Sequence, residues 1–288
     1  INTLNIQTLS TGELEKAACC NLSESFGTNA TVDVNFTDAV SGAKQIQMLG
    51  LDGVYAQITQ ENMPFIRGMS STFGLNYVPG TWIESIQIIK GSGSVLNGFE
   101  SLTGQINLEY YKPESSPKLF WNMYTNQEGK IENNLLVAKK NGKWKSNLFT
   151  HISYSNQEID ANSDTFIDMP KVKQINVLNR WEYVDSKYHI AFTARGLVED
   201  RVGGQINSIP NPYVVDIQNQ LFELTSKTGF ILPNIPGKSI GLQTSYRRHR
   251  NELIFGDNNY NALQESLYLN LIRQTLINNT NNHILKYG

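Results

Sequence analysis

Residues 144–154 read Trp-Lys-Ser-Asn-Leu-Phe-Thr-His-Ile-Ser-Tyr, a stretch in which apolar and polar side chains largely alternate. One face of an extended chain would carry Trp144, Leu148, Ile152 and Tyr154, and the other Lys145, Asn147, His151 and Ser153. Successive side chains of a β-strand point to opposite faces. The stretch therefore predicts a strand with one apolar wall and one wet wall.

The same pattern recurs farther along the chain, at 175–183, 188–195, 240–247 and 267–271. Short connections are predicted at Asn141-Gly142, which is an Asn-Gly hairpin signal, and at 184–187, 233–238 and 278–282. Longer polar connections are predicted near 156–172, 198–218 and 250–263. Short turns on one side and long loops on the other are typical of an outer-membrane β-barrel. A soluble β-sandwich or barrel also alternates, so both architectures stay open on alternation alone.

Composition and charge exclude several classes of protein. The net charge is −2, which gives no electrostatic basis for binding nucleic acid. No run of eighteen apolar residues occurs, as a transmembrane helix would require. We find no nucleophile–base pair, paired carboxylates or metal triad at usable spacing, and we therefore expect no enzyme. The N-terminus has neither the basic start nor the apolar stretch of a signal peptide, so we expect the chain to begin inside a longer precursor.

The first 112 residues follow a different pattern of short, glycine-punctuated segments. Ser10 and Glu13 make a capping box ahead of a short helix, and a second short helix is predicted from Leu22 to Phe26. Strands are predicted at 31–35, 44–49, 83–90 and 104–111. The segment Lys112–Pro117 has the composition of a linker. We therefore predict a small α+β domain at 1–112, a linker at 113–117 and barrel strands at 118–288.

Four stretches in the first domain carry a specific resemblance. They are KQIQMLGLDG at 44–53, VPGTWIESIQIIKG at 78–91, SGSVLNG at 92–98 and LTGQINL at 102–108. In this order and spacing they resemble the plug of TonB-dependent outer-membrane receptors, with the character of receptors from the Bacteroidetes. The resemblance implies an α+β plug domain inside an antiparallel transmembrane β-barrel. That barrel is incomplete in this chain, because about nine strands fit the rest of the sequence and these transporters have about 22.

The sequence departs from the family pattern at two turns. Leu49 stands where the family has an arginine, which puts in doubt a charged contact between plug and barrel wall at that position. Glu61-Asn62-Met63-Pro64 replaces the usual Ile-Asp-Gly-x-Pro turn. The box that couples such receptors to their energy source is not recognisable before Leu9, and we expect it upstream.

The resemblance implies import of a scarce nutrient, which would be a metal chelate, cobalamin, haem, a metal ion or an oligosaccharide. Ligand would bind at the plug apex and the long barrel loops, and the TonB energy-transducing complex would move the plug. Outer-membrane lipids and a surface lipoprotein would be further partners, and the location would be the outer membrane of a Gram-negative bacterium. The alternative is a soluble, secreted β-rich adhesion or glycan-binding module.

Several residues are candidates for these roles. Ligand contact is predicted for Met63, Phe65, Arg67 and Met69, with a wall contact as the alternative for Arg67. Structural roles in the plug motif are predicted for Gly50, Pro79, Lys90, Gly91, Gly98 and Gly104. Cys19 and Cys20 are adjacent, and together with Met48, Met63 and Met69 they would suit a soft metal such as copper. Alternatively, the two cysteines are simply small buried residues at the end of a helix. No further cofactor is expected.

Overall fold

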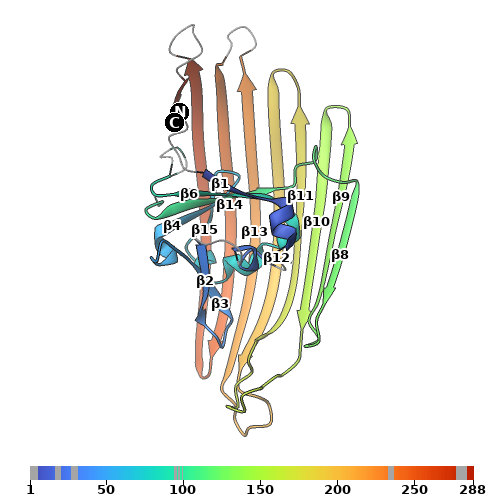
Figure 1. Ribbon diagram of the computed structural model, residues 1–288, viewed down its shortest axis with the longest axis vertical. Helices are drawn as coiled ribbons and strands as arrows, with labels where there is room; N and C mark the ends of the chain where they lie inside the picture. The colour runs from blue at the N-terminus through green and yellow to red at the C-terminus, as the bar shows by residue number, and fades with distance from the viewer. Residues whose placement is uncertain are drawn as a thin grey trace.

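The structure is a computed structural model that describes residues 6–16, 21–26, 32–93, 96, 98, 100–232, 237–276 and 284–288. In these ranges the chain forms one nine-stranded sheet and a smaller N-terminal unit. Figure 1 shows the N-terminal unit lying against one face of the large sheet, whose strands extend beyond it at both ends. No helix in the described ranges is both long and apolar enough to cross a membrane.

The N-terminal unit contains a five-stranded sheet with the order β1-β6-β7-β4-β5 and a β2-β3 hairpin. Its strands are β1 Ile6–Ser10, β2 Val32–Asp38, β3 Ala43–Met48, β4 Ala56–Gln60, β5 Met63–Ile66, β6 Ile83–Lys90 and β7 Gly104–Tyr110. Its helices are α1 Thr11–Lys16 and α2 Ser70–Phe73, with 3-10 turns at η1 Glu24–Phe26, η2 Gly53–Tyr55, η3 Gly74–Tyr77 and η4 Gly80–Trp82. Ile86, Ile88, Ile106 and Leu108 of the two central strands are fully buried, so β6 and β7 form the core.

The large sheet is an antiparallel meander in which every strand pairs with its neighbours in sequence. Its strands are β8 Leu119–Thr125, β9 Ile131–Asn141, β10 Trp144–Ser155, β11 Lys171–Val184, β12 Tyr188–Gly204, β13 Val214–Ile231, β14 Ser239–Phe255, β15 Asn258–Leu276 and β16 Ile284–Tyr287. The sheet is open, because no pairing joins β8 to β16 among the described residues. We call the end with connections 142–143, 185–187 and 232–238 the turn end, and the opposite end the loop end.

The two faces of the large sheet have opposite character, as the alternation predicts. On the outer face, Leu267, Leu269 and Leu271 are 69%, 64% and 60% exposed. On the inner face, Asn147 and Asn176 are fully buried against the N-terminal unit. The apolar face has no second sheet packed on it in the part of the chain that the structure describes. This is the arrangement of a barrel wall and differs from that of a β-sandwich, whose apolar faces pack together.

The structure confirms part of the predicted element list and corrects the rest. The predicted strand at 83–90 is β6 without change. The Glu13 carboxylate accepts from the Ser10 backbone N–H, which is one of the two hydrogen bonds of a capping box, and also from Ser10 Oγ. The predicted long loop at 250–263 is wrong, because β14 and β15 are joined by Gly256 and Asp257 alone. Arg248–Glu252 are polar on both faces of β14 and Leu253–Phe255 are apolar on both, so the alternation disappears although the pairing continues. The loop predicted at 198–218 shortens to 205–213 for the same reason.

The sequence also missed β1, β4 and β5, which are short strands without a clear alternation. Between the two units, β7 ends at Tyr110 and β8 begins at Leu119. The domain boundaries at 112 and 117 stay a prediction.

Candidate functional site

The inner face of the large sheet holds the N-terminal unit through side chains that reach its backbone. Asn176 Nδ2 donates to the Tyr77 carbonyl at 2.7 Å, and the Arg195 guanidinium donates to the same oxygen. The Arg247 guanidinium donates to the Phe65 carbonyl. These donors come from β11, β12 and β14, so several wall strands fix one short stretch of the N-terminal unit.

Phe65 lies between two of these arginines. Its ring centroid is 5.4 Å from the Arg195 guanidinium carbon and 5.0 Å from that of Arg247. A cation over an aromatic ring is attracted by the ring quadrupole, more strongly where water is excluded. The Phe65 side chain is buried, so it acts here as a wall contact of β5.

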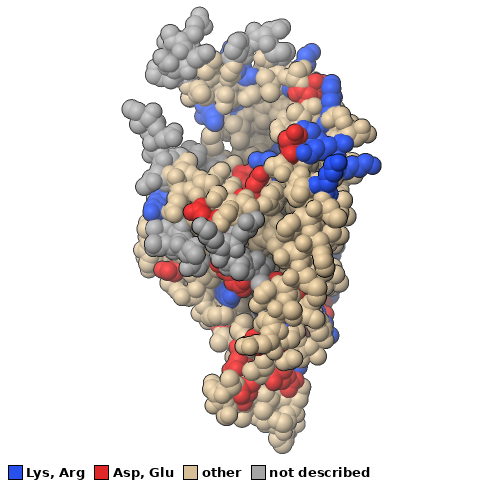
Figure 2. All heavy atoms as spheres, turned by 45° about the vertical axis from the view of Figure 1, so that its right-hand side comes forward, with Lys and Arg blue, Asp and Glu red and all other residues tan. Residues whose placement is uncertain are grey.

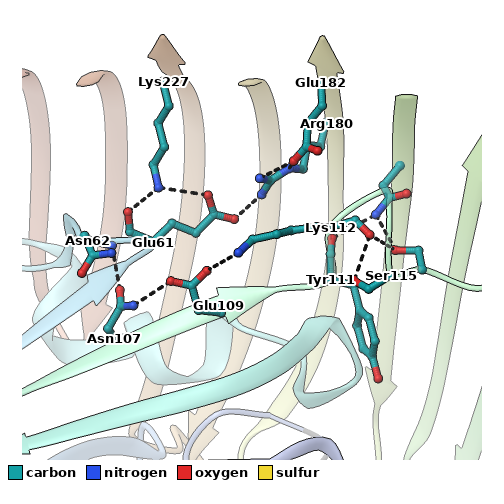
Figure 3. A network of polar contacts seen from close by, with 12 residues as sticks. Glu61, Asn62, Asn107, Glu109, Tyr111, Lys112, Ser115, Arg180, Glu182 and Lys227 are labelled. Atoms are coloured by element: carbon teal, nitrogen blue, oxygen red, sulfur yellow. Dashed lines mark hydrogen bonds and ion pairs between the residues drawn. The ribbon is translucent and has the colours of Figure 1, made fainter. Parts of the chain in front are cut away.

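A charged network joins the β4–β5 turn to the wall on the side of the turn end (Figure 3). The Arg180 guanidinium donates to Glu61 and also to Glu182 at 2.6 Å. Lys227 Nζ lies 3.1 Å from the other Glu61 oxygen and donates to the Glu61 carbonyl as well. Glu61 and its neighbour Asn62 have positive φ angles of 50° and 63°, which aim the turn at the wall. We call Glu61, Arg180, Glu182 and Lys227 the latch.

The charge balance of the latch keeps Glu61 ionised. Burial alone would raise the pKa of this carboxyl, but Lys227 and Arg180 outweigh that effect and lower the pKa below its ordinary value of 4.5. Glu61 and Arg180 are both almost completely buried. A buried charge without a partner costs several kcal/mol, so the two sides of the latch depend on each other.

The latch continues into the N-terminal sheet through a polar chain, also visible in Figure 3. The Asn62 N–H donates to Asn107 Oδ1 at 2.7 Å, and Asn107 Nδ2 donates to Glu109 at 2.8 Å. Glu109 pairs with Lys112 at 3.0 Å. A line of contacts therefore runs from the wall to the first residue of the segment that leads to β8.

That segment is tied to the wall as well. Asn147 Nδ2 on β10 donates to the Tyr111 carbonyl at 2.9 Å and to Ser116 Oγ at 2.7 Å. Lys145 pairs with Glu114 beside it. Because Asn147 is fully buried, these hydrogen bonds are shielded from water.

A narrow polar groove opens on the loop-end side of the N-terminal unit. Its volume is about 120 Å³, and its lining includes Lys44, Lys130, His151, Glu199 and Arg201. Arg201 pairs with Glu199 at 3.1 Å and donates to the Ser41 carbonyl at 3.2 Å. The groove offers charges of both signs to a polar molecule that approaches from the loop end.

The sequence of the N-terminal unit matches one family. Residues 2–105 match the model of the TonB-dependent receptor plug domain. The open sheet that follows the plug matches the barrel of such receptors in solved structures. None of the curated proteins matches the sequence.

The solved structures share the fold at low identity. The ferric-catecholate import receptor Fiu of E. coli K12, in its open form, has a TM-score of 0.67 at 13% identity, over 95% of this chain and 45% of that one. FpvA of P. aeruginosa, bound to heterologous pyoverdines, has a TM-score of 0.76 at 12% identity, over 98% and 41%. The copper transporter OprC has a TM-score of 0.58 at 12% identity, over 97% and 48%. The chain thus spans less than half the length of these receptors.

The four predicted ligand contacts have different settings in the plug. Met63 and Phe65 are buried within β5. Arg67 pairs with Glu100 of the plug at 3.3 Å, with 39% of its side chain exposed. The Met69 N–H donates to Gln264 Oε1 on β15 at 2.9 Å. Arg67 and Met69 are thus partly exposed while Met63 and Phe65 are buried, and the ligand-binding role of the group stays a prediction.

The predicted motif residues lie in turns and at close approaches of the plug. Gly50, Gly91 and Gly98 have positive φ angles of 75°, 81° and 113°. A Cβ on Gly104 would stand 2.6 Å from the Ile89 carbonyl oxygen. Pro79 bridges to Asn21, and Lys90 ends β6.

Cys19 and Cys20 lie outside the described residues. Within the described ranges, no three His, Cys, Asp or Glu side chains gather closely enough to hold a metal ion. Met48 and Met63 are buried in the plug, and copper binding at the cysteine pair stays a prediction.

The latch is the part of the site that sequence reasoning missed. Leu49, in the place of the family arginine, is exposed, and the plug-to-wall charge contact forms instead at Glu61. Arg180 and Glu182 were recognisable as inward-facing charges on a predicted strand. A buried charge needs a partner, and the unusual Glu61 turn was the available signal for it.

Proposed function

We propose that the full-length protein is a TonB-dependent outer-membrane receptor that imports a scarce nutrient. The observation that carries this proposal is the large sheet, which is apolar outside and wet inside, with the plug held on its wet face. A barrel of about 22 strands leaves a wide lumen, and a plug is needed to keep it closed. The family is one of receptors and transporters rather than enzymes.

Ligand binds from the loop end in this proposal, at the polar groove and at the accessible Arg67. The TonB complex pulls on the plug from the turn end, and the latch on that side then opens. Fiu is an import receptor for ferric catecholates, FpvA is bound to a pyoverdine–iron complex and OprC is a copper transporter. These three favour a metal chelate or a metal ion over cobalamin, haem or an oligosaccharide.

Two experiments test the proposal on the full-length protein. Expressed in a Gram-negative host, it should fractionate with outer membranes, and deletion of the plug should make those membranes leak ions. Recovery of the folded protein from the soluble periplasm would overturn the proposal in favour of a secreted β-rich module. A growth panel with ferric chelates, copper, cobalamin, haem and oligosaccharides, each as the limiting nutrient, would then identify the ligand.

A further inference from the structure

A lysine directly precedes four of the five described strands that start at the turn end, and the fifth, β16 (Ile284–Tyr287), follows His283 in the sequence. Lys118 precedes β8, Lys143 precedes β10, Lys187 precedes β12 and Lys238 precedes β14. We call these four residues the lysine rim. Four repeats at one structural position indicate a common role for the charge at the edge of the sheet.

Backbone hydrogen bonds place Lys143, Lys187 and Lys238 at the ends of the neighbouring strands and Lys118 slightly farther along the wall. The carbonyl of each lysine accepts from a neighbouring strand or turn, with donors Ala138, Val184, Ile231 and Leu232 at 2.9 to 3.1 Å. Val184 and Ile231 are the last residues of β11 and β13, and Leu232 directly follows β13, so three of the four lysines mark where the strands end. The partner of Lys118, Ala138, lies three residues before the end of β9.

An aromatic band lies next to the rim on the apolar face. Trp144 packs against Tyr183 with ring centroids 5.1 Å apart, and Tyr188 packs against Phe230 at 5.2 Å. Trp144 and Tyr188 directly follow rim lysines in the sequence. Aromatic girdles of membrane barrels lie at the level of lipid headgroups, so the rim lies at or just beyond that level.

Charge is distributed unevenly along the sheet. Figure 2 shows Lys and Arg gathered near the turn end, at the top, and Asp and Glu gathered at the loop end, at the bottom. The loop-end connections carry Glu128, Glu158, Asp160, Asp164, Asp168 and Asp257 against the single Lys130. At the turn end Lys143 pairs with Asp185 at 2.9 Å, whereas Lys118 and Lys187 have no acidic partner among the described residues.

We propose that the lysine rim binds the headgroups of anionic phospholipids in the leaflet at the turn end. This inference rests on the proposed function, because it requires the outer face to stand in a membrane. Lysine stems cover apolar surface while their ammonium groups reach the phosphates, which is how lysines behave at membrane interfaces. Each lysine close to an anionic lipid surface contributes about 1 kcal/mol, or about a fivefold preference.

The test measures lipid preference of the full-length receptor in phosphatidylcholine vesicles that contain a trace of spin-labelled lipid. The readout is the association of spin-labelled phosphatidylglycerol with the protein, divided by that of spin-labelled phosphatidylcholine. We expect a ratio of several-fold for the wild type and close to one for K118Q/K143Q/K187Q/K238Q. Heat-modifiable mobility on gels checks that the variants are folded.

Lys173 provides a matched control, because it is an exposed strand lysine at the loop end. K187Q should lower the ratio and K173Q should leave it unchanged. Any of three results would overturn the inference. The wild-type ratio could be one, the ratio could be unchanged by the quadruple substitution, or K173Q and K187Q could lower it equally. In those cases a receptor that inserts into vesicles leaves the proposed function standing, whereas failure to insert at all would overturn both.

Discussion

The latch makes a quantitative prediction for Glu61→Gln. The substitution keeps the shape of the side chain and removes its charge. Arg180 then stays buried with Glu182 as its one remaining carboxylate, and Lys227 loses its ion pair. The β4–β5 turn should therefore open more often in the variant than in the wild type.

The size of the effect follows from the burial of the partners. Removing one partner of a buried ion pair costs about 3–5 kcal/mol. Glutamine still accepts a hydrogen bond from Arg180, and Lys227 is 27% exposed, so water reduces its share of the cost. We therefore expect about 2–3 kcal/mol, which corresponds to a loss of about 30- to 150-fold in protection.

Amide hydrogen exchange on the full-length receptor measures this opening directly. The reporting peptide covers β4 and β5, and a peptide from the β2–β3 hairpin serves as the internal reference. Glu114→Gln is the matched control, because Glu114 also pairs with a lysine of the wall but is largely exposed. A surface pair contributes about 0–1 kcal/mol, so this variant should exchange almost as the wild type does.

The reasoning would be refuted if E61Q exchanged at the wild-type rate in β4 and β5. It would be weakened equally if E114Q lost as much protection as E61Q. The double-mutant cycle of E61Q with K227Q adds an independent criterion. The two residues are in contact, so their effects should be non-additive by about 1–2 kcal/mol.

Three further outcomes are expected. The lowered pKa of Glu61 means that its contribution to stability is complete above pH 4.5 and is lost as the pH falls through the lowered value, so plug protection measured against pH should drop there in the wild type and not in E61Q. Leu269→Lys on the outer face should cost about 2–4 kcal/mol of barrel stability in vesicles, while Asn270→Lys on the inner face should cost clearly less. Gly104→Ala should destabilise the plug by about 1–3 kcal/mol in chemical unfolding, because the new methyl group meets the Ile89 backbone.

Much of the fold could be predicted because one physical rule governs the strands of a wall. Each residue must suit either the apolar or the water-filled side of the wall. Apolar and polar residues therefore alternate along β10 and β11 with a period of two. The rule fails where both sides are wet. Strand β14 carries polar residues on both faces at Arg248–Glu252, so the sequence there resembles a loop although its pairing with β15 continues.

The plug was recognised from its motif, whereas its contacts with the wall were not. The partners of Glu61 are 119 and 166 positions away, and no local pattern links them. Inward-facing charges on a predicted strand showed that partners must exist without showing which ones. The exposure of a plug side chain to solvent also depends on residues that are distant in sequence. Phe65 is buried by two arginines of β12 and β14, which lie far from it along the chain.

The mixture of contacts in the plug–wall interface suits a plug that must hold its position and still move. Apolar contacts, such as Trp82 against Phe149 at 5.4 Å, resist separation because each Å² exposed to water costs about 25 cal/mol. Charged contacts behave differently. When Glu61 and Arg180 separate, both become hydrated, and the net cost is small because desolvation had offset most of their attraction. When the same groups stay buried without the right partner, the cost is large. The latch therefore imposes a large free-energy cost on a plug that is buried in the wrong position. It imposes only a small cost on a plug whose charged groups move out into water. A plug that is pulled from the turn end requires both properties.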